Sequence, residues 1–235
     1  MTCNPKWREI QENLQPGQND SDRPDLVSRV FHLKLKELLI DINDRELLGK
    51  VDAKIYVIEF QKRGLPHAHI LLWLSSSAKL RYEDDIDNLI SAEIPDPLTQ
   101  PLLHDIVKET MIHGPCGIVN GKVYDKRPCQ YTGKCSKKFP KSFSDSTIIC
   151  VDGYPIYQRR NNGRFVEVRG CKLDNRWVVP YCPILSLRYG CQISLETCAS
   201  IKSVNTSLYM LTLMTKSKCT LIQGMSGDAL VFRPV

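Results

Sequence analysis

The chain has 235 residues, 42% of them hydrophobic, and 32 Lys and Arg against 26 Asp and Glu give a formal net charge of +6. This length and apolar content allow the chain a hydrophobic core of its own, which excludes a wholly disordered chain and favours one domain or one domain with a small insert. No apolar run approaches the roughly 20 residues that a bilayer span requires, so no membrane partner is expected. The mild positive charge favours a polyanionic partner without specifying it.

Helical and strand patterns alternate through the first half of the chain. Apolar residues at helical spacing, behind a Ser/Asp cap and a proline, predict a helix over about residues 25–42. Residues 51–74 are typical of two strands that form a hairpin, with Gly64 in the turn. Residues 83–113 are interrupted by prolines and predict two short helices.

The second half is rich in strand patterns. Strands are expected around residues 148–151, 154–159 and 164–168, because the turn-forming pairs Asp-Gly and Asn-Gly separate them. These strands predict an antiparallel sheet. The sequence as a whole therefore predicts an α+β fold, a central antiparallel sheet with flanking helices and a Cys/His insert.

The ten cysteines bear on the cellular compartment. In a small secreted protein such a number indicates disulfides, but no charged segment followed by an apolar one, the pattern of a signal peptide, opens this chain. We therefore expect a reducing compartment. Five of the cysteines, at positions 150, 171, 182, 191 and 198, are expected to be small buried residues.

Two histidines lie in the second strand of the hairpin, within the stretch FQKRGLPHAHILL. Side chains two residues apart project from the same face of a strand, so His67 and His69 are expected side by side. The preceding strand can add an oxygen ligand, Gln61 or alternatively Glu59, which gives a three-ligand cation site with open positions for substrate. The alternative is a pair of half-buried histidines that are hydrogen-bonded to the backbone.

A second candidate metal site has the spacing H-x2-C-x12-C-x5-C. Its residues are His113, Cys116, Cys129 and Cys135. Nitrogen and sulfur donors in this combination are typical of a tetrahedral Zn²⁺ site. The alternative is a group of free thiols in a cysteine-rich chain.

Basic and aromatic residues are interleaved after residue 134, which fits a path for a nucleic-acid backbone and its bases. The basic residues are Lys134, Lys137, Lys138, Lys141, Arg159, Arg160, Arg164, Arg169 and Arg176, with Tyr154, Tyr157 and Trp177 between them. The alternative is a solvated basic surface above core aromatics. For Trp177 we expect the core position.

Several of these stretches resemble one family when they are taken together. MTCNPKW at residues 1–7 is similar to the first motif, and EFQKRGLPHAH at residues 59–69 to the metal motif, of the replication-initiator domain of Helitron transposases, members of the HUH endonuclease superfamily. HGPCG, KCSKKFPK, DGYPIYQRRNNGR and LDNRWVVPY are similar to the blocks that follow. The resemblance covers roughly residues 1–204.

The resemblance implies a palm-like antiparallel sheet that binds single-stranded DNA. It implies His67 and His69 as ligands of Mg²⁺ or Mn²⁺, with Gln61 where related initiators have Glu or Gln. A tyrosine then attacks the scissile phosphate, which leaves a 5′-phosphotyrosine and a free 3′-hydroxyl. Lys6 and Trp7 of the first motif would hold DNA near the metal, although Trp7 equally fits a core anchor. Nuclear localisation is implied as well.

The C-terminal segment departs from the family pattern. Relatives continue into a helix with Lys-Tyr-x-x-x-Tyr, whereas this chain has only Tyr209 nearby, a weak candidate for the nucleophile. Codons for residues 205–212 can be read, with one added upstream base, as a segment with two tyrosines four residues apart. We therefore hypothesise that the coding sequence lost one base near Val204.

This hypothesis leads to expectations about organisation and activity. Residues 1–204 are expected to be the initiator domain, truncated within its first motif, and residues 205–235 a non-native tail that packs poorly. Full-length relatives carry a helicase domain, which is not expected here. Nicking is expected to be lost, and the alternatives are a catalytically dead remnant that still binds single-stranded DNA and a non-functional product of a decayed transposon.

Overall fold

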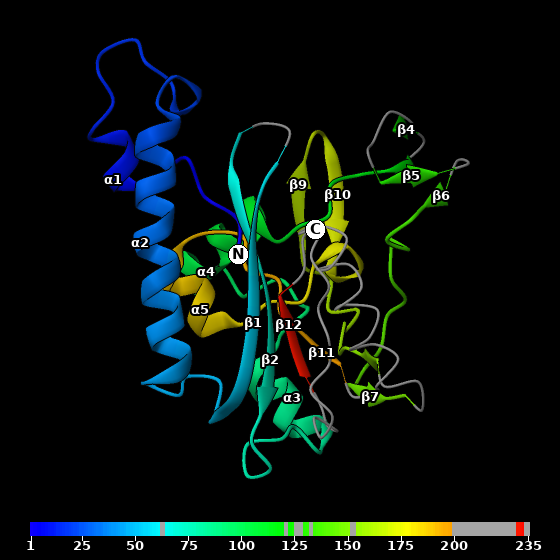
Figure 1. The fold of residues 1–235 in the computed structure, drawn as a ribbon. Coiled ribbons are helices and arrows are strands. Elements are labelled where there is room, and N and C mark those ends of the chain that lie inside the picture. Colours follow the sequence, from blue (N-terminus) through cyan, green and yellow to red (C-terminus); the bar gives the residue numbers. More distant parts are fainter. Residues whose placement is uncertain are drawn as a thin grey trace.

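The computed structural model describes residues 1–61, 64–119, 122–124, 129–131, 134–150, 154–198 and 229–232. Helices and antiparallel strands form an α+β arrangement, as the sequence predicts (Figure 1). The helices are α1 (Arg8–Gln11), α2 (Pro24–Asn43), α3 (Glu83–Leu89), α4 (Pro101–Thr110) and α5 (Pro183–Tyr189), with 3₁₀ turns η1 (Asp20–Asp22) and η2 (Asn175–Trp177). The strands are β1 (Val51–Phe60), β2 (Pro66–Leu74), β3 (Gly117–Val119), β4 (Lys122–Tyr124), β5 (Gln130–Tyr131), β6 (Lys134–Cys135), β7 (Ile148–Ile149), β8 (Pro155–Ile156), β9 (Phe165–Val168), β10 (Cys171–Asp174), β11 (Glu196–Cys198) and β12 (Ala229–Phe232).

The largest sheet has four strands in the order β1-β2-β12-β11, and all neighbours run antiparallel. β1 and β2 form the predicted hairpin, whose pairs run from Val51 with Leu74 to Phe60 with Pro66. β1 alternates between half-buried and exposed residues, whereas every residue of β2 is buried. β1 is therefore an edge strand and β2 an interior strand, which explains why β2 has a continuous apolar run.

The strand β12 packs within the sheet, whereas the C-terminal segment was expected to pack poorly. It lies between β2 and β11, and its residues Leu230 and Val231 are buried. A strand in this place pairs with the backbone N–H and C=O groups of both neighbours, which would otherwise face each other across a gap. The rest of residues 205–235, including Tyr209, lies outside the described residues. The frameshift and the domain boundary at residue 204 stay predictions.

The helix α2 covers one face of this sheet, and Figure 1 shows it running alongside β1 and β2. Its bounds agree with the predicted helix to within one residue at each end. One apolar stripe of the helix is buried, as the spacing predicts. The first core combines Val27, Phe31, Leu35, Leu38 and Ile42 of α2 with Ala68, Ile70, Leu72 and Leu74 of β2.

The buried carboxylate of Asp41 joins α2 to α5. It accepts a 2.5 Å hydrogen bond from Tyr189 Oη and forms ion pairs with Arg45 and Arg188. Burial raises the pKa of Tyr189 well above its usual range, and the hydrogen bond to Asp41 adds to this effect. Tyr189 is therefore a neutral donor at physiological pH.

Asp41→Asn is expected to lower the free energy of unfolding by about 2 kcal/mol, because the two arginines lose their buried counter-charge and a charged acceptor is replaced by a neutral one. Urea unfolding followed by circular dichroism measures the change. Glu37→Gln is the matched control, since Glu37 pairs with the same two arginines at the surface, where an ion pair contributes at most about 1 kcal/mol. Equal losses in both variants would contradict the prediction.

A second core lies in the later part of the chain. Here α4 packs with the β9–β10 hairpin and with residues 177–181. Trp177 is buried in this core, as the sequence predicts. The two short helices expected in residues 83–113 are α3 and α4, so this prediction is also confirmed.

The strands of residues 148–174 pair differently from the prediction. β7 pairs with β8, as expected, but β9 pairs with β10 and not with the strand before it, and each pair is a separate two-stranded sheet. The Asn-Gly pair at residues 162–163 therefore does not close a hairpin. The preference of an Asn-Gly turn is local, whereas the second core decides the partner of β9 by burying Val166 and Leu173.

Candidate functional site

The histidine pair lies on the face of the central sheet away from α2. The register of the hairpin places Glu59 opposite His67 and Val57 opposite His69. The ring centroids of the two histidines are 4.6 Å apart, and His69 Nε2 lies 3.0 Å from Glu59 Oε2. The two-residue period of the strand thus brings both imidazoles and one carboxylate together.

Thr2 fixes the orientation of His67. It forms an isolated antiparallel bridge with His67, and its Oγ1 lies 2.5 Å from His67 Nδ1 and donates at 2.8 Å to Gln192 Oε1. Because the single hydroxyl proton goes to Gln192, Thr2 accepts from Nδ1–H, which leaves the lone pair of the imidazole on Nε2. That Nε2 is buried and has no hydrogen-bond partner among the described residues.

The protonation state of both histidines suits a ligand role. Burial, together with the smaller effects of positive charge on the Met1 amine and His69, lowers the pKa of His67 to about 2. Burial also lowers the pKa of His69, against the opposing effect of Glu59, and the charge of Lys137 adds to the lowering. Both rings are therefore neutral at pH 7, which is the form that binds a cation.

Glu59 supplies the carboxylate that contacts the histidine pair. Two ligands at about 2.1 Å from one Mg²⁺ and at a right angle are about 3 Å apart, which matches the spacing of His69 Nε2 and Glu59 Oε2. Gln61 lies at the turn, where its N–H donates to Leu65 O and its carbonyl accepts from Gly64 N–H. Imidazole and carboxylate are donor types that bind a divalent cation. Glu59 lies directly opposite His67 in the hairpin, and the ligand roles of Glu59 and Gln61 stay predictions.

A second group of donors can hold a metal ion. The ligand atoms of His113, Cys116, Cys129 and Cys135 all lie within 4.8 Å of one another. Zn–S bonds of about 2.3 Å in a tetrahedron separate the donors by about 3.8 Å, and Cys135 Sγ lies 3.8 Å from His113 Nε2. Within the described ranges, this is the one cluster of three or more His, Cys, Asp or Glu that gathers so closely.

The second core supports this Cys/His cluster. The His113 ring stacks on Phe139 with centroids 4.3 Å apart, and its backbone N–H donates to Trp177 O at 2.8 Å. Burial raises the pKa of Cys116 to about 12, so a cation is needed to hold its thiolate form. The eight cysteines whose side chains are described are free thiols.

Four of the candidate DNA contacts are held by carboxylates. The ion pairs are Lys6 with Glu109, Arg160 with Glu93, Arg164 with Asp96 and Arg176 with Asp174. Arg160 and Arg176 each contact both oxygens of their partner. A paired cation attracts phosphate less strongly than a lone one, so these four residues are weaker candidates than the sequence indicates.

Two further candidates are buried. Trp7 is 6% exposed, and its Nε1 donates to Tyr189 O at 2.7 Å, which fits the alternative of a core anchor. Arg159 is 3% exposed, and its Nη1 donates to the carbonyls of Ala92, Asn175 and Val178. This geometry favours a structural role for Arg159, because three backbone acceptors surround its guanidinium.

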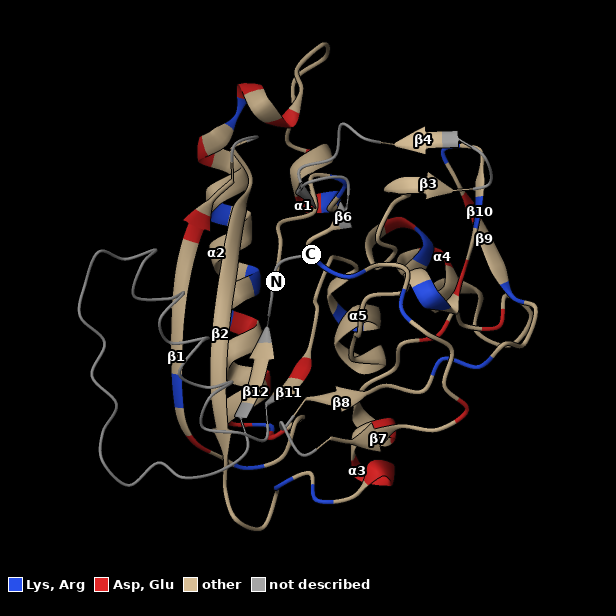
Figure 2. Ribbon diagram, turned by 90° about the vertical axis from the view of Figure 1, so that its right-hand side faces the viewer, with Lys and Arg blue, Asp and Glu red and all other residues tan. Residues whose placement is uncertain are grey.

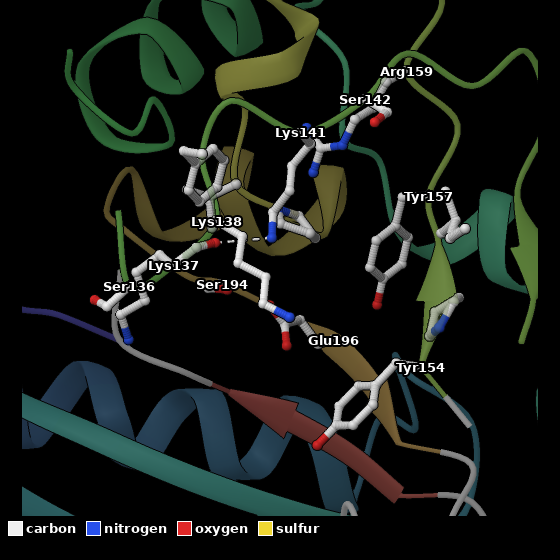
Figure 3. Close-up of a pocket in the computed structure, with 15 residues that line it drawn as sticks. Ser136, Lys137, Lys138, Lys141, Ser142, Tyr154, Tyr157, Arg159, Ser194 and Glu196 are labelled. Atoms are coloured by element: carbon white, nitrogen blue, oxygen red, sulfur yellow. Dashed lines mark hydrogen bonds between the residues drawn. The ribbon is translucent and has the colours of Figure 1, made fainter. Parts of the chain in front are cut away.

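Lys137 and Lys138 are exposed and lie at a pocket of about 580 Å³ (Figure 3). Lys141, Tyr154, Tyr157 and Glu196 also line it. Sequence reasoning named the lysines and tyrosines as part of a DNA path, but not their gathering around one cavity. It missed Thr2 and Glu196, although the similarity of the first seven residues to a family motif was a signal for Thr2.

The charged residues are spread over most elements of the ribbon, and acidic residues colour α3 (Figure 2). The net charge of +6 therefore does not by itself identify a binding face. Among the helices that the structure describes, none has the length and apolar character needed to cross a membrane.

The fold and the candidate sites define an α+β protein with a histidine pair on an antiparallel sheet and a separate Cys/His cluster. Residues 1–72 match the family model described as the Helitron helicase-like domain at the N-terminus. Residues 1–72 are thus similar to the Helitron helicase-like N-terminal domain, as their motifs indicate. The match includes the histidine pair. No curated protein matches the chain.

Proposed function

We propose that the chain is a Helitron replication-initiator domain that binds single-stranded DNA through a divalent cation, Mg²⁺ or Mn²⁺, at His67 and His69. The observation that carries this proposal is the buried Nε2 of His67, which points its lone pair away from Thr2 and has no partner among the described residues. It lies within the segment that matches the Helitron domain. In this proposal, the antiparallel sheet that presents the pair plays the part of the palm in HUH endonucleases.

The residues of the site have separate roles in this proposal. His67 and His69 supply nitrogen ligands, Glu59 or Gln61 supplies an oxygen ligand, and Thr2 holds the His67 ring in place. A bound cation would polarise the DNA phosphate and orient it. Lys137 and Lys138 attract the DNA backbone, and the domain acts in the nucleus.

We also propose that nicking is lost in this chain. In nicking, a tyrosine oxygen forms a bond to the scissile phosphorus while the bond to the 3′-oxygen breaks, and a proton ends on the free 3′-hydroxyl. Tyr209 has no second tyrosine four residues away in the sequence, unlike the family motif. Loss of a nucleophile removes most of the rate, so a DNA-binding remnant is the form of this function that the sequence favours.

A covalent-adduct and binding experiment tests both proposals. The protein is incubated with 3′-labelled single-stranded DNA and Mn²⁺, beside His67→Ala, Tyr209→Phe and the control His32→Ala, an exposed histidine of α2. We expect binding that needs Mn²⁺, is reduced about tenfold or more in His67→Ala and is unchanged in the other two variants, because only His67 supplies a ligand. We expect no covalent adduct.

Two outcomes would contradict these proposals separately. A denaturation-resistant adduct that disappears in both His67→Ala and Tyr209→Phe would show an active nuclease. DNA binding that is independent of Mn²⁺ and equal in His67→Ala and the wild type would show that the histidine pair has no role in binding. Circular dichroism of each variant establishes that it is folded.

A further inference from the structure

The pocket of Figure 3 has one basic wall and one aromatic wall. The segment of residues 136–142 contributes Lys137, Lys138 and Lys141, and the figure shows the amines of Lys138 and Lys141 pointing into the open space. Tyr154 and Tyr157 line the other side. Proteins that bind single-stranded nucleic acid combine basic side chains, which contact the phosphates, with aromatic rings, on which the bases stack. Lysines that face aromatic rings across a cavity provide this combination.

The pocket lies over the same face of the central sheet as the histidine pair. Glu196 of β11 pairs with Val231 of β12, and Val231 pairs with Leu71 of β2, so these three side chains project from one face. Leu71 is two residues from His69, which places His69 on that face too. The Cα atoms of His69 and Glu196 are therefore roughly 12 Å apart, two strand spacings across and two residues along.

The aromatic wall of the pocket contacts the sheet face that carries the histidine pair. The Tyr154 side chain packs against the cluster of Leu71, Trp73 and Val231 on this face. The pocket and the histidine pair are therefore parts of one continuous surface.

We propose that this pocket holds one nucleotide of the DNA strand whose phosphate lies at the histidine pair, with Lys137 and Lys138 on the backbone and Tyr154 against the base. This inference rests on the proposed function. The cavity volume lies in the range of pockets that enclose a small organic group. The three lysines outnumber the single carboxylate of Glu196, which suits a phosphate.

Tyr157 and Lys141 shape the pocket. The Tyr157 hydroxyl accepts a 3.0 Å hydrogen bond from Thr197 N–H, which joins the tyrosine to β11. Lys141 Nζ donates to Lys137 O at 2.9 Å and lies 5.0 Å from the centre of the Phe139 ring. The Lys141 contacts stabilise the conformation of the 136–142 segment, and the Tyr157 contact joins the aromatic wall to β11. The exposed Lys138 and the ring of Tyr154 are therefore the better residues to substitute.

Fluorescence anisotropy with a labelled single-stranded oligonucleotide, in Mn²⁺ and over a range of salt concentrations, tests the pocket. Lys138→Gln is expected to weaken binding and to reduce the salt dependence by about one phosphate contact. Tyr154→Leu keeps the apolar packing on the sheet, and it is expected to weaken binding about tenfold with the salt dependence unchanged, because it removes only base stacking. Lys54→Gln, on the opposite face of β1, is the control and is expected to bind like the wild type.

Photo-crosslinking provides an independent readout. With 5-iodouracil in the oligonucleotide, we expect the crosslinked peptide to contain Tyr154, and no crosslink at this peptide in a Tyr154→Leu variant. Equal affinity of Lys138→Gln, Tyr154→Leu and Lys54→Gln, with wild-type Mn²⁺ dependence, would overturn the pocket while leaving the function of the histidine pair. Absence of any DNA binding by the wild type would overturn both.

Discussion

Replacing Arg159 with leucine is expected to lower the free energy of unfolding by about 4 kcal/mol, because a buried cation and its hydrogen bonds are lost together. The guanidinium donates to Asn175 O at 2.7 Å, Val178 O at 2.6 Å and Ala92 O at 3.3 Å. Burial lowers the pKa of Arg159 to about 10, so the group is still charged at pH 7. Its loss leaves these carbonyls short of a donor inside the second core.

Chemical unfolding followed by tryptophan fluorescence measures this loss. Arg164→Leu is the matched control, since Arg164 pairs with Asp96 at a half-exposed site and contributes at most about 1 kcal/mol. Arg159→Lys keeps the charge with fewer donors and is expected to fall between the two. If Arg159 instead contacts DNA as the sequence predicts, Arg159→Leu would keep its stability and lose DNA affinity, which contradicts the structural role.

Removal of the metal from the Cys/His cluster is expected to lower the melting temperature by about 10 °C. We propose that the bound ion is Zn²⁺, because the donor set is one nitrogen and three sulfurs. The metal binds only to the folded state, so its binding free energy stabilises the folded chain. A loss of about 4 kcal/mol corresponds to this shift for a chain of this length.

Metal analysis and thermal unfolding test this prediction together. We expect one Zn²⁺ per chain in the wild type, none in Cys129→Ser and the same lowered melting temperature for Cys129→Ser and for the chelated wild type. Cys150→Ser is the control, because Cys150 lies outside the cluster. Protein purified under reducing conditions that holds no metal and does not respond to added Zn²⁺ would favour the alternative of free thiols.

The cluster also bears on the pocket, because Cys135 directly precedes the segment of residues 136–142. Ser136 N–H donates to Cys129 O at 2.7 Å, and Lys138 N–H donates to Cys135 O at 2.9 Å. A metal that fixes both cysteines therefore also fixes the start of the basic wall. Metal removal is accordingly a structural perturbation of the pocket as well as of the second core.

Local patterns in the sequence determined the helix α2, the β1–β2 hairpin and the common face of His67 and His69. Each depends on a period of 3.6 or 2 residues, which the chain carries within one segment. Spacing alone also indicated the four residues of the Cys/His cluster, and the structure gathers them. Motif resemblance supplied the Helitron relationship, which the match over residues 1–72 supports.

Only the tertiary structure decided which segments meet across long separations in the chain. It placed β12 between β2 and β11, Thr2 against His67, and the guanidinium of Arg159 among three carbonyls. It also showed that Lys137 and Lys138 are exposed, whereas other basic residues in similar stretches of the sequence are buried or paired with carboxylates. Such placements depend on which surfaces pack together, and no local period of side chains encodes that choice.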